Sequence, residues 1–276
     1  MKTIAIFRRV GEIPPMDWFG QGCFASGYGP DLIDPDEFTG QGCDIAVVSG
    51  GLARYNQTNN RLFHFYRSHN IDTFVIEHGR LVPQRIIREY WIHYLNGVPM
   101  LPGLNPTMTH ERRRRLELET NFIKRGEAIV VAGQDLLTDR MLGIHIMESL
   151  RQFTKRKIIY RPRYTEGVDK HCAELADEVH LDAIDPWKDI AQAWAVITGW
   201  SNMGGEALMA GIPVVCEPCA SYAEYASSGP LDGIDSWARP SVERIEEYLM
   251  RFSYLLWSNE ELREGAGFRW MMEHGR

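Results

Sequence analysis

Short apolar runs separated by longer amphipathic segments recur along the chain. Each run spans only a few residues and stops at glycine, proline or charged residues, which is typical of buried strands. Strands that alternate with helices of ordinary length form parallel sheets covered by helices on both faces. The pattern therefore predicts an α/β protein with strands at residues 4–7, 44–49, 72–77, 128–132, 157–160, 179–181, 195–198 and 214–216.

The segments between these runs carry apolar residues at helical spacing. Pro186 stands in the first turn of one predicted helix, and Ser241 is the N-cap of another. Residues 97–109 hold three prolines and two glycines and predict a loop. We place a domain boundary near this loop and expect two domains, residues 1–120 and 121–276. The predicted helices cover residues 59–69, 85–95, 139–153, 185–194, 206–210, 241–257 and 259–272.

Composition limits the kinds of protein that this chain can be. Its 276 residues are enough for two compact domains. The net charge of −7 excludes a positive field over the whole molecule, although a local basic stripe stays open. No apolar run approaches the roughly 20 residues of a membrane span. Five unevenly spaced cysteines argue against a disulfide framework, so we expect a cytoplasmic protein without a secretory signal or a zinc site.

The most informative stretch is residues 194–218, WAVITGWSNMGGEALMAGIPVVCEP. It predicts a strand, a tight turn, a short helix, a second turn and a second strand. Small residues where the helix begins would leave backbone N–H groups and the positive end of the helix dipole facing a ligand. Glu206, in the first turn, is placed to accept hydrogen bonds from sugar hydroxyls. A phosphate joined to a ribose suits this arrangement, and the alternative is an ordinary βαβ turn with a structural Glu206.

Polar residues and glycines follow the predicted strands. Ligands of α/β sheets bind at the carboxyl ends of strands, so these residues form a candidate binding rim. They are Gly50-Gly51, Glu77-His78-Gly79, Gly133-Gln134-Asp135, Arg161-Pro162-Arg163 and Ser201-Asn202.

Motifs in the second half are similar to those of capsule-type sugar transferases. Arg161-Pro162-Arg163 resembles their basic-Pro-basic motif, although the usual motif has His where this chain has Arg163. Gly133-Gln134-Asp135 resembles their Gly-Gln loop, and residues 198–215 resemble their Ser-x-x-Gly-x-Glu-Ala-Leu segment. This half thus resembles the donor domain of GT-B glycosyltransferases. The resemblance implies a GT-B-like fold with two Rossmann-like domains whose parallel sheets face a central cleft.

The first half has a similarity of its own. DTFVIEHGRL (residues 72–81) and REYWIHYLNG (residues 88–97) are similar to a group of bacteriophage glycosyltransferase-like proteins, some of them linked to modified DNA bases. The basic run HERRRRLELE (residues 110–119) is either a solvated helix face or a binding site for DNA phosphates. The resemblance therefore implies a second partner besides the sugar donor, namely duplex DNA with modified bases.

The resemblance gives the candidate residues their expected roles. The guanidinium groups of Arg161 and Arg163 would neutralise a diphosphate, unless they form a surface salt bridge. Glu206 would hold the donor ribose, and Gln134 would meet the phosphate or the sugar. Further phosphate oxygens would be bound by Ser201, Asn202 and the amides of Gly204 and Gly205.

The acceptor hydroxyl must also lose a proton. His78 has a suitable intrinsic pKa, and Glu77 lies beside it; a structural role for both is the alternative. Asp17 and Glu12 are reserve candidates. GT-B enzymes are metal-independent, which implies that no metal and no cofactor is needed besides the co-substrate, a nucleotide sugar such as a UDP-sugar.

Taken together, the resemblance implies a glycosyltransferase that moves a sugar from a nucleotide sugar to a hydroxylated acceptor. The acceptor that we prefer at this stage is a 5-hydroxymethylpyrimidine base in phage DNA. A capsule or lipopolysaccharide sugar transferase, a non-catalytic nucleotide-sugar-binding protein and a nucleotide-sugar epimerase are the alternatives.

Overall fold

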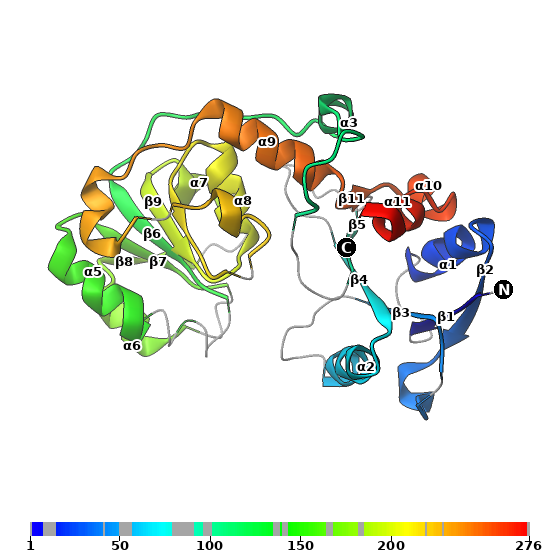
Figure 1. Ribbon diagram of the computed structural model, residues 1–276. Coiled ribbons are helices and arrows are strands. Elements are labelled where there is room, and N and C mark those ends of the chain that lie inside the picture. Colours follow the sequence, from blue (N-terminus) through cyan, green and yellow to red (C-terminus); the bar gives the residue numbers. More distant parts are fainter. Residues whose placement is uncertain are drawn as a thin grey trace. The chain divides into compact units, whose positions relative to one another are not determined.

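The computed structural model describes residues 2–7, 15–40, 42–49, 57–78, 91–95, 101–134, 139, 143–163, 168–181, 185–218, 220–227 and 229–274. The chain divides into two compact units (Figure 1). The first unit comprises Met1–Arg80, Arg85–Arg112 and Met250–Arg276, and the second comprises Leu81–Gln84 and Arg113–Leu249. None of the helices in these described ranges is both long and apolar enough to cross a membrane.

The first unit contains a six-stranded sheet with the order β11-β5-β4-β3-β1-β2. The four strands from β2 to β4 in this order are parallel, and β5 and β11 are antiparallel to their neighbours. The strands are β1 (Lys2–Phe7), β2 (Tyr28–Ile33), β3 (Ile45–Ser49), β4 (Asp72–His78), β5 (Trp91–Leu95) and β11 (Leu256–Trp257).

Three of these strands differ from the prediction. The expected helix of residues 241–257 ends at Ser253, and Leu256–Trp257 form the short strand β11. The expected helix at residues 85–95 is wrong for its described part, because Trp91–Leu95 is a strand paired with β4. Its sequence, WIHYL, is rich in the aromatic and β-branched residues that favour strands. Strand β2 was not predicted, because Gly29, Pro30 and Asp31 interrupt its apolar pattern. These residues are tolerated because β2 is an edge strand.

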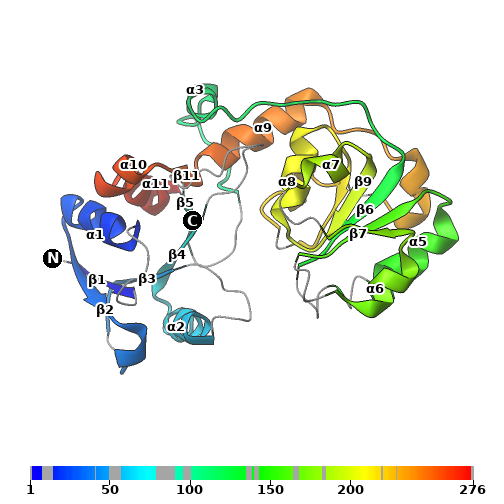
Figure 2. The ribbon, with the colours of Figure 1, turned by 180° about the vertical axis from the view of Figure 1, so that it is seen from behind.

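The end of the chain belongs to the first unit, so the expected second domain of residues 121–276 is wrong in its last part. Phe268 is the reason: its ring lies 5.7 Å from that of Phe19 and 5.5 Å from that of Phe74, centroid to centroid. The helices that carry Phe19 and Phe268 lie side by side in both views (Figures 1 and 2). The helices of this unit are α1 (Pro15–Ala25), η1 (Pro35–Glu37), α2 (Gln57–Ser68), α10 (Asn259–Arg263) and α11 (Ala266–His274), with α3 (His110–Arg115) at the boundary.

The second unit contains a five-stranded sheet in which every pair is parallel, with the order β10-β9-β6-β7-β8. In chain order within the unit this is 3-2-1-4-5 read from β8, the arrangement of half a Rossmann fold. Strand order reverses between β6 and β9, and ligands of such sheets bind beside this switch point. The strands are β6 (Ala128–Ala132), β7 (Ile158–Arg161), β8 (Glu178–Val179), β9 (Ala193–Thr198) and β10 (Val214–Val215).

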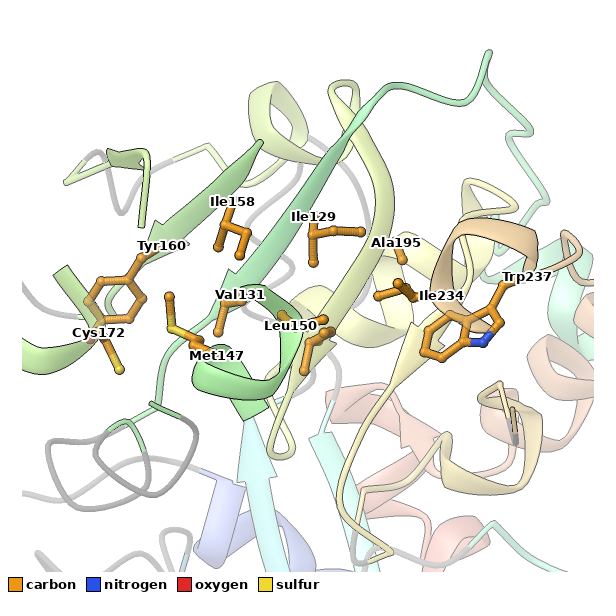
Figure 3. Close-up of a cluster of buried hydrophobic side chains, with 11 residues drawn as sticks. Ile129, Val131, Met147, Leu150, Ile158, Tyr160, Cys172, Ala195, Ile234 and Trp237 are labelled. Atoms are coloured by element: carbon orange, nitrogen blue, oxygen red, sulfur yellow. The ribbon is translucent and has the colours of Figure 1, made fainter. Parts of the chain in front are cut away.

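Helices cover both faces of this second sheet (Figure 1). They are η2 (Gly143–Met147, a π-helical turn), α5 (Glu148–Phe153), α6 (Lys170–Leu175), α7 (Trp187–Ile190), α8 (Asn202–Met209), η4 (Ala223–Tyr225), η5 (Leu231–Ser236) and α9 (Val242–Ser253). On one face, alternate strand residues pack against Met147, Leu150 and Cys172 in a closed apolar core (Figure 3). The other strand residues point to the opposite face, where α7 and α8 pack.

The packing of α11 gives a prediction for stability. Phe268→Ala should lower the free energy of unfolding by about 3–5 kcal/mol, because it removes a buried ring from the core of the first unit. Phe24→Ala is the matched control, since Phe24 is 67% exposed on α1 and its loss should change little. Urea denaturation of both variants measures the difference, and equal stability of the two would contradict the placement of the C-terminal segment.

Candidate functional site

Three strands of the second sheet end at the same level. Ala132, the last residue of β6, is in register with Arg161 of β7 on one side and Thr198 of β9 on the other. Partnered residues of parallel strands point to the same face, so Arg161 and Thr198 both lie on the α7 and α8 face. The Thr198 hydroxyl donates to the Ala132 carbonyl oxygen at 2.9 Å. The predicted rim of Gln134, Arg161 and Ser201 thus begins at one edge of the sheet.

Helix α8 begins four residues before the predicted segment of residues 206–210, so Glu206 lies in its second turn and not, as expected, in the first. Ser201 is the N-cap, and its hydroxyl accepts from the amide of Met203 at 3.4 Å. The helix ends in a Schellman motif: Gly211 has φ +71°, and the amides of Gly211 and Ile212 donate to the carbonyls of Leu208 and Ala207. This end requires glycine because other residues rarely adopt positive φ.

The amides at the start of α8 are less available than expected. The amide of Gly204 already donates to the Ser201 carbonyl oxygen at 2.9 Å, so the prediction that this group is bare is wrong. Asn202 is exposed and precedes it in the first turn, where helix amides have no carbonyl partner within the helix. Gly205 is buried within α8. Any anion at this terminus would therefore meet the helix through its first residues.

Gly204 has a packing role that the sequence did not reveal. The Tyr222 hydroxyl donates to the Ser201 carbonyl oxygen at 2.6 Å, which brings its ring across the start of α8. A Cβ at Gly204 would lie 2.6 Å from Tyr222 Cε2 and would overlap the hydroxyl oxygen. Gly204 is therefore needed for the approach of Tyr222, which fixes the turn that carries Ser201.

Gln134 follows β6, and Asp139 fixes its backbone. The backbone N–H of Gln134 donates to Asp139 Oδ1 at 2.6 Å, and the Tyr160 hydroxyl donates to Asp139 Oδ2 at 2.5 Å. Burial, together with Asp139, raises the pKa of Tyr160, so its hydroxyl remains a donor. The Gln134 side chain is 6% exposed, and its Oε1 has no hydrogen-bond partner among the described residues.

The two arginines of the Arg161-Pro162-Arg163 motif have different environments. Arg161 is 7% exposed and its Nη1 forms an ion pair with Asp189 Oδ2. Arg163 is exposed and lies just beyond the strand. The alternative that Arg161 forms a salt bridge is met in part, because the pair exists but is buried and not at the surface. Asp189 was not among the predicted site residues. It lies in α7, in the segment DPWKDI, and only its distance from the helix start at Pro186 could have indicated a role for it.

Glu206 is the acid of the site; the residue is partly exposed, but its Oε2 atom is buried. Burial raises its pKa to about 7; the charge of Arg161 opposes this rise, and the charge of Asp185 adds to it. Its Oε2 is buried and accepts no hydrogen bond from the described residues. An unsatisfied buried oxygen is costly, which is why such groups in native proteins usually have a partner from protein, water or ligand. A ligand hydroxyl at Oε2 would supply this missing donor.

The buried groups together favour a ligand that is both anionic and rich in hydroxyls. Glu206 and Gln134 each present an acceptor oxygen without a partner in the described part of the chain. The buried indole N–H of Trp187, from α7, also has no hydrogen-bond partner in the described part of the chain, and the sequence did not indicate this donor. Arg161, paired with Asp189, contributes a guanidinium group on the same face of the sheet as these helices. A sugar joined to phosphate matches both requirements.

The expected catalytic groups lie mostly outside what the structure describes. Glu77 and His78 are the last residues of β4, but their side chains are outside the described residues, as are Glu12, Gly50, Gly51, Gly79 and Asp135. Asp17 lies in the first turn of α1. The roles of Glu77 and His78 stay predictions.

The basic run of residues 110–119 is neither a fully solvated face nor a free row of cations. Arg112 donates to both carboxylate oxygens of Glu261, at 2.6 and 3.2 Å, and its guanidinium lies 4.0 Å from the centroid of the Trp257 ring. Arg113 pairs with Glu246 at 3.2 Å. These two arginines hold the chain where it passes from the first unit to the second, while Arg114 and Arg115 are exposed.

Carboxylates elsewhere have structural roles. Asp34-Pro35-Asp36 is an Asp-x-Asp sequence, and Asp34 Oδ1 accepts from the amide of Asp36 at 2.9 Å to cap η1. Within the described ranges, no cluster of three or more His, Cys, Asp or Glu side chains could hold a metal ion. Of the Cys216–Cys219 pair, only Cys216 is described.

Comparison with known proteins supports the fold. No protein family and no curated protein matches the sequence. Among solved structures, the chain is similar to a beta Kdo 2,7 transferase, KpsC of Thermosulfurimonas dismutans, with 16% identity over 97% of this chain and 99% of that chain and a TM-score of 0.54. It is also similar to the beta Kdo 2,4 transferase of the same protein, with 13% identity over 90% of each chain and a TM-score of 0.53.

These similarities confirm the expected fold class. The chain has a GT-B-like α/β fold with two Rossmann-like units, and at the level of fold it resembles capsule-type sugar transferases. At these identities the likeness concerns the fold alone, so the activity has to be argued from the site.

The contact between Gly204 and Tyr222 gives a second stability prediction. Gly204→Ala should destabilise the second unit by about 1–3 kcal/mol, because the added methyl group forces Tyr222 and the N-cap turn apart. Gly233→Ala is the matched control, since a Cβ there meets its nearest atom at 3.7 Å. Thermal unfolding followed by circular dichroism compares them, and an unchanged melting temperature for Gly204→Ala would refute the steric role.

The ion pair of Arg161 gives a third prediction. Arg161→Ala should cost about 3–5 kcal/mol of stability, because the buried Asp189 would lose its guanidinium partner and keep only His180. Arg161→Met combined with Asp189→Asn should recover part of this loss, since it removes both charges. A double-mutant cycle by urea denaturation measures the coupling, and strictly additive effects would contradict a direct pair.

Proposed function

We propose that this protein is a glycosyltransferase that binds a nucleotide sugar in its second unit and transfers the sugar to a hydroxylated acceptor. The observation that carries the proposal is the Glu206 carboxyl group, whose buried Oε2 has no partner in the described chain and whose pKa is raised by burial to about 7. A carboxyl group in this state is costly to the folded protein unless a ligand donates to it.

The donor would lie at the switch point between β6 and β9. Arg161, with Arg163 at the rim, would neutralise the diphosphate, and Ser201 and Asn202 would contact it from the start of α8. Glu206 would accept from a ribose hydroxyl, and Gln134 would accept from the sugar through Oε1. The fold match to capsule-type transferases supports a donor site at this sheet, and the roles of these residues are argued from the site alone.

Transfer requires the diphosphate to leave and the acceptor oxygen to lose its proton. Preorganised positive charge at Arg161 and helix dipole at α8 would stabilise the negative charge that develops on the leaving phosphate. His78 is the proposed general base, with Glu77 beside it, because both end a strand of the first unit. The proposed co-substrate is a nucleotide sugar such as a UDP-sugar.

For the acceptor, we propose a saccharide hydroxyl, because the chain shares its fold with proteins described as beta Kdo transferases. The 5-hydroxymethylpyrimidine acceptor rests on the first-half similarity to phage proteins alone. The basic run, for which a DNA-phosphate site was one of two alternatives, uses Arg112 and Arg113 for internal contacts. Incorporation of radiolabelled sugar into oligosaccharide or into hydroxymethylated duplex separates the two acceptors.

Glu206 gives a prediction that separates a ligand-binding role from a structural one. Because its folded pKa of about 7 exceeds the ordinary value of 4.5, the stability it contributes is complete below pH 4.5 and is lost as pH rises through 7. Glu206→Gln should therefore raise the stability of the free protein at pH 8 by up to about 3 kcal/mol and leave it unchanged at pH 4.5. The same variant should weaken nucleotide-sugar binding about tenfold or more at pH 8.

Thermal shift with a panel of nucleoside diphosphates and their sugars measures both effects, because a ligand that binds only the folded state raises the melting temperature. The matched control is Glu217→Gln, which changes an exposed acid of the same unit. A Glu206→Gln variant that is less stable at pH 8 and binds the panel as the parent does would show that Glu206 is structural.

A further inference from the structure

Arg161 is the inner end of a line of charged side chains. Its ion pair uses Asp189 Oδ2, and Asp189 Oδ1 lies 2.6 Å from His180 Nδ1. His180 Nε2 in turn lies 3.1 Å from Glu178 Oε2, and Glu178 Oε1 lies 2.6 Å from Lys157 Nζ. The line therefore runs from the buried end of β7 to the exposed edge of the sheet at β8.

Asp189 is the central member of this line. It is 2% exposed, and each of its carboxylate oxygens has one cationic or polar partner. A buried carboxylate with both oxygens engaged is held in one orientation, and it holds Arg161 in turn. His180 is partly exposed, so it can exchange protons with solvent while it touches this buried acid.

The charge of Arg161 reaches the proposed ligand site. Arg161 and Thr198 flank Ala132 in one row at the carboxyl edge of the sheet, and the positive charge of Arg161 is felt at Glu206. When His180 is neutral, Asp189 cancels the charge of Arg161. When His180 is protonated, the three groups together carry one positive charge.

We propose that Asp189 and His180 are positioning residues for Arg161, and that a proton on His180 strengthens the binding of an anion beside this guanidinium. The proposal rests on the proposed function only in taking Arg161 to face the diphosphate of the donor. It adds Asp189 and His180 to the residues that act on the anion, and it makes anion affinity depend on pH, which the donor assignment does not require.

The groups that face His180 determine the sign of the effect. Asp189 from α7 and Glu178 from β8 both raise the pKa of His180, the hydrogen bond to Asp189 most strongly. Lys157 offsets Glu178, with which it pairs. His180 is therefore protonated up to a pH above its ordinary 6.5, and anion binding should weaken as the pH rises through its raised pKa.

Sulfate is a suitable probe because its charge is constant between pH 5 and 9. Binding and protonation are reciprocal, so if His180 protonation strengthens sulfate binding about threefold, saturating sulfate raises the pKa of His180 by about half a unit. NMR titration of the imidazole signals in sulfate and in chloride of equal ionic strength measures this shift. His171, which lies 2.8 Å from the exposed Glu148, is the internal control and should not move.

Two variants complete the test. Asp189→Asn should abolish the response of His180 to sulfate, because the carboxylate that joins His180 to Arg161 is gone. His180→Gln should lose about threefold in sulfate affinity at pH 6 and nothing at pH 9, whereas His171→Gln should bind as the parent does at both. An unshifted His180 in the parent protein, or equal shifts of His180 and His171, would overturn the proposal.

The outcome is separable from that of the donor assignment. A sulfate-dependent shift of His180 in a protein that binds no nucleotide sugar would support the positioning pair and refute the proposed function. Binding of nucleotide sugars with no shift in the pKa of His180 would support the proposed function and refute the positioning role of Asp189 and His180.

Discussion

The proposed site depends on a buried carboxyl oxygen, Oε2 of Glu206, that has no hydrogen-bond donor in the described part of the chain. Glu206 projects from α8, the helix that follows β9 at the switch point of a parallel sheet. Two opposing effects set the pKa of Glu206: burial favours the neutral acid, and Arg161 favours the carboxylate. Burial prevails in the free protein, so the site is prepared for a ligand that brings a hydrogen-bond donor. The unsatisfied Oε2 lowers the stability of the free protein, and a ligand that donates to it would restore that stability on binding.

The surrounding structure keeps this group in place through contacts that have no part in binding. Tyr222 fixes the turn before α8, and Asp139 fixes the residue after β6. Asp189 holds Arg161 at the end of β7. Each of the three strand ends at the site is thus held by one side chain from a different element. Loss of any of these supports should displace a ligand-facing residue without touching the ligand.

Much of this could be predicted from the sequence, and the failures have physical reasons. The apolar runs and the Gly-Gly-Glu turn indicated the second sheet, α8 and Glu206, because these features depend on local pattern. The strand at Trp91–Leu95 was missed because its pairing with β4 is not local. The placement of α11 was missed because Phe268 packs against residues far earlier in the chain. The ion pair between Arg161 and Asp189 joins β7 to α7, and the sequence distance between the two residues gives no sign of it.

The most direct test is the pKa of the Glu206 carboxyl group, measured by carbon-13 NMR in the free protein and with a saturating nucleotide sugar. We expect a value near 7 in the free protein. On binding it should fall by about one unit or more, because a hydroxyl that donates to the carboxylate favours the charged form. A pKa near 4.5 in the free protein, or a value that no nucleotide sugar alters, would contradict the account.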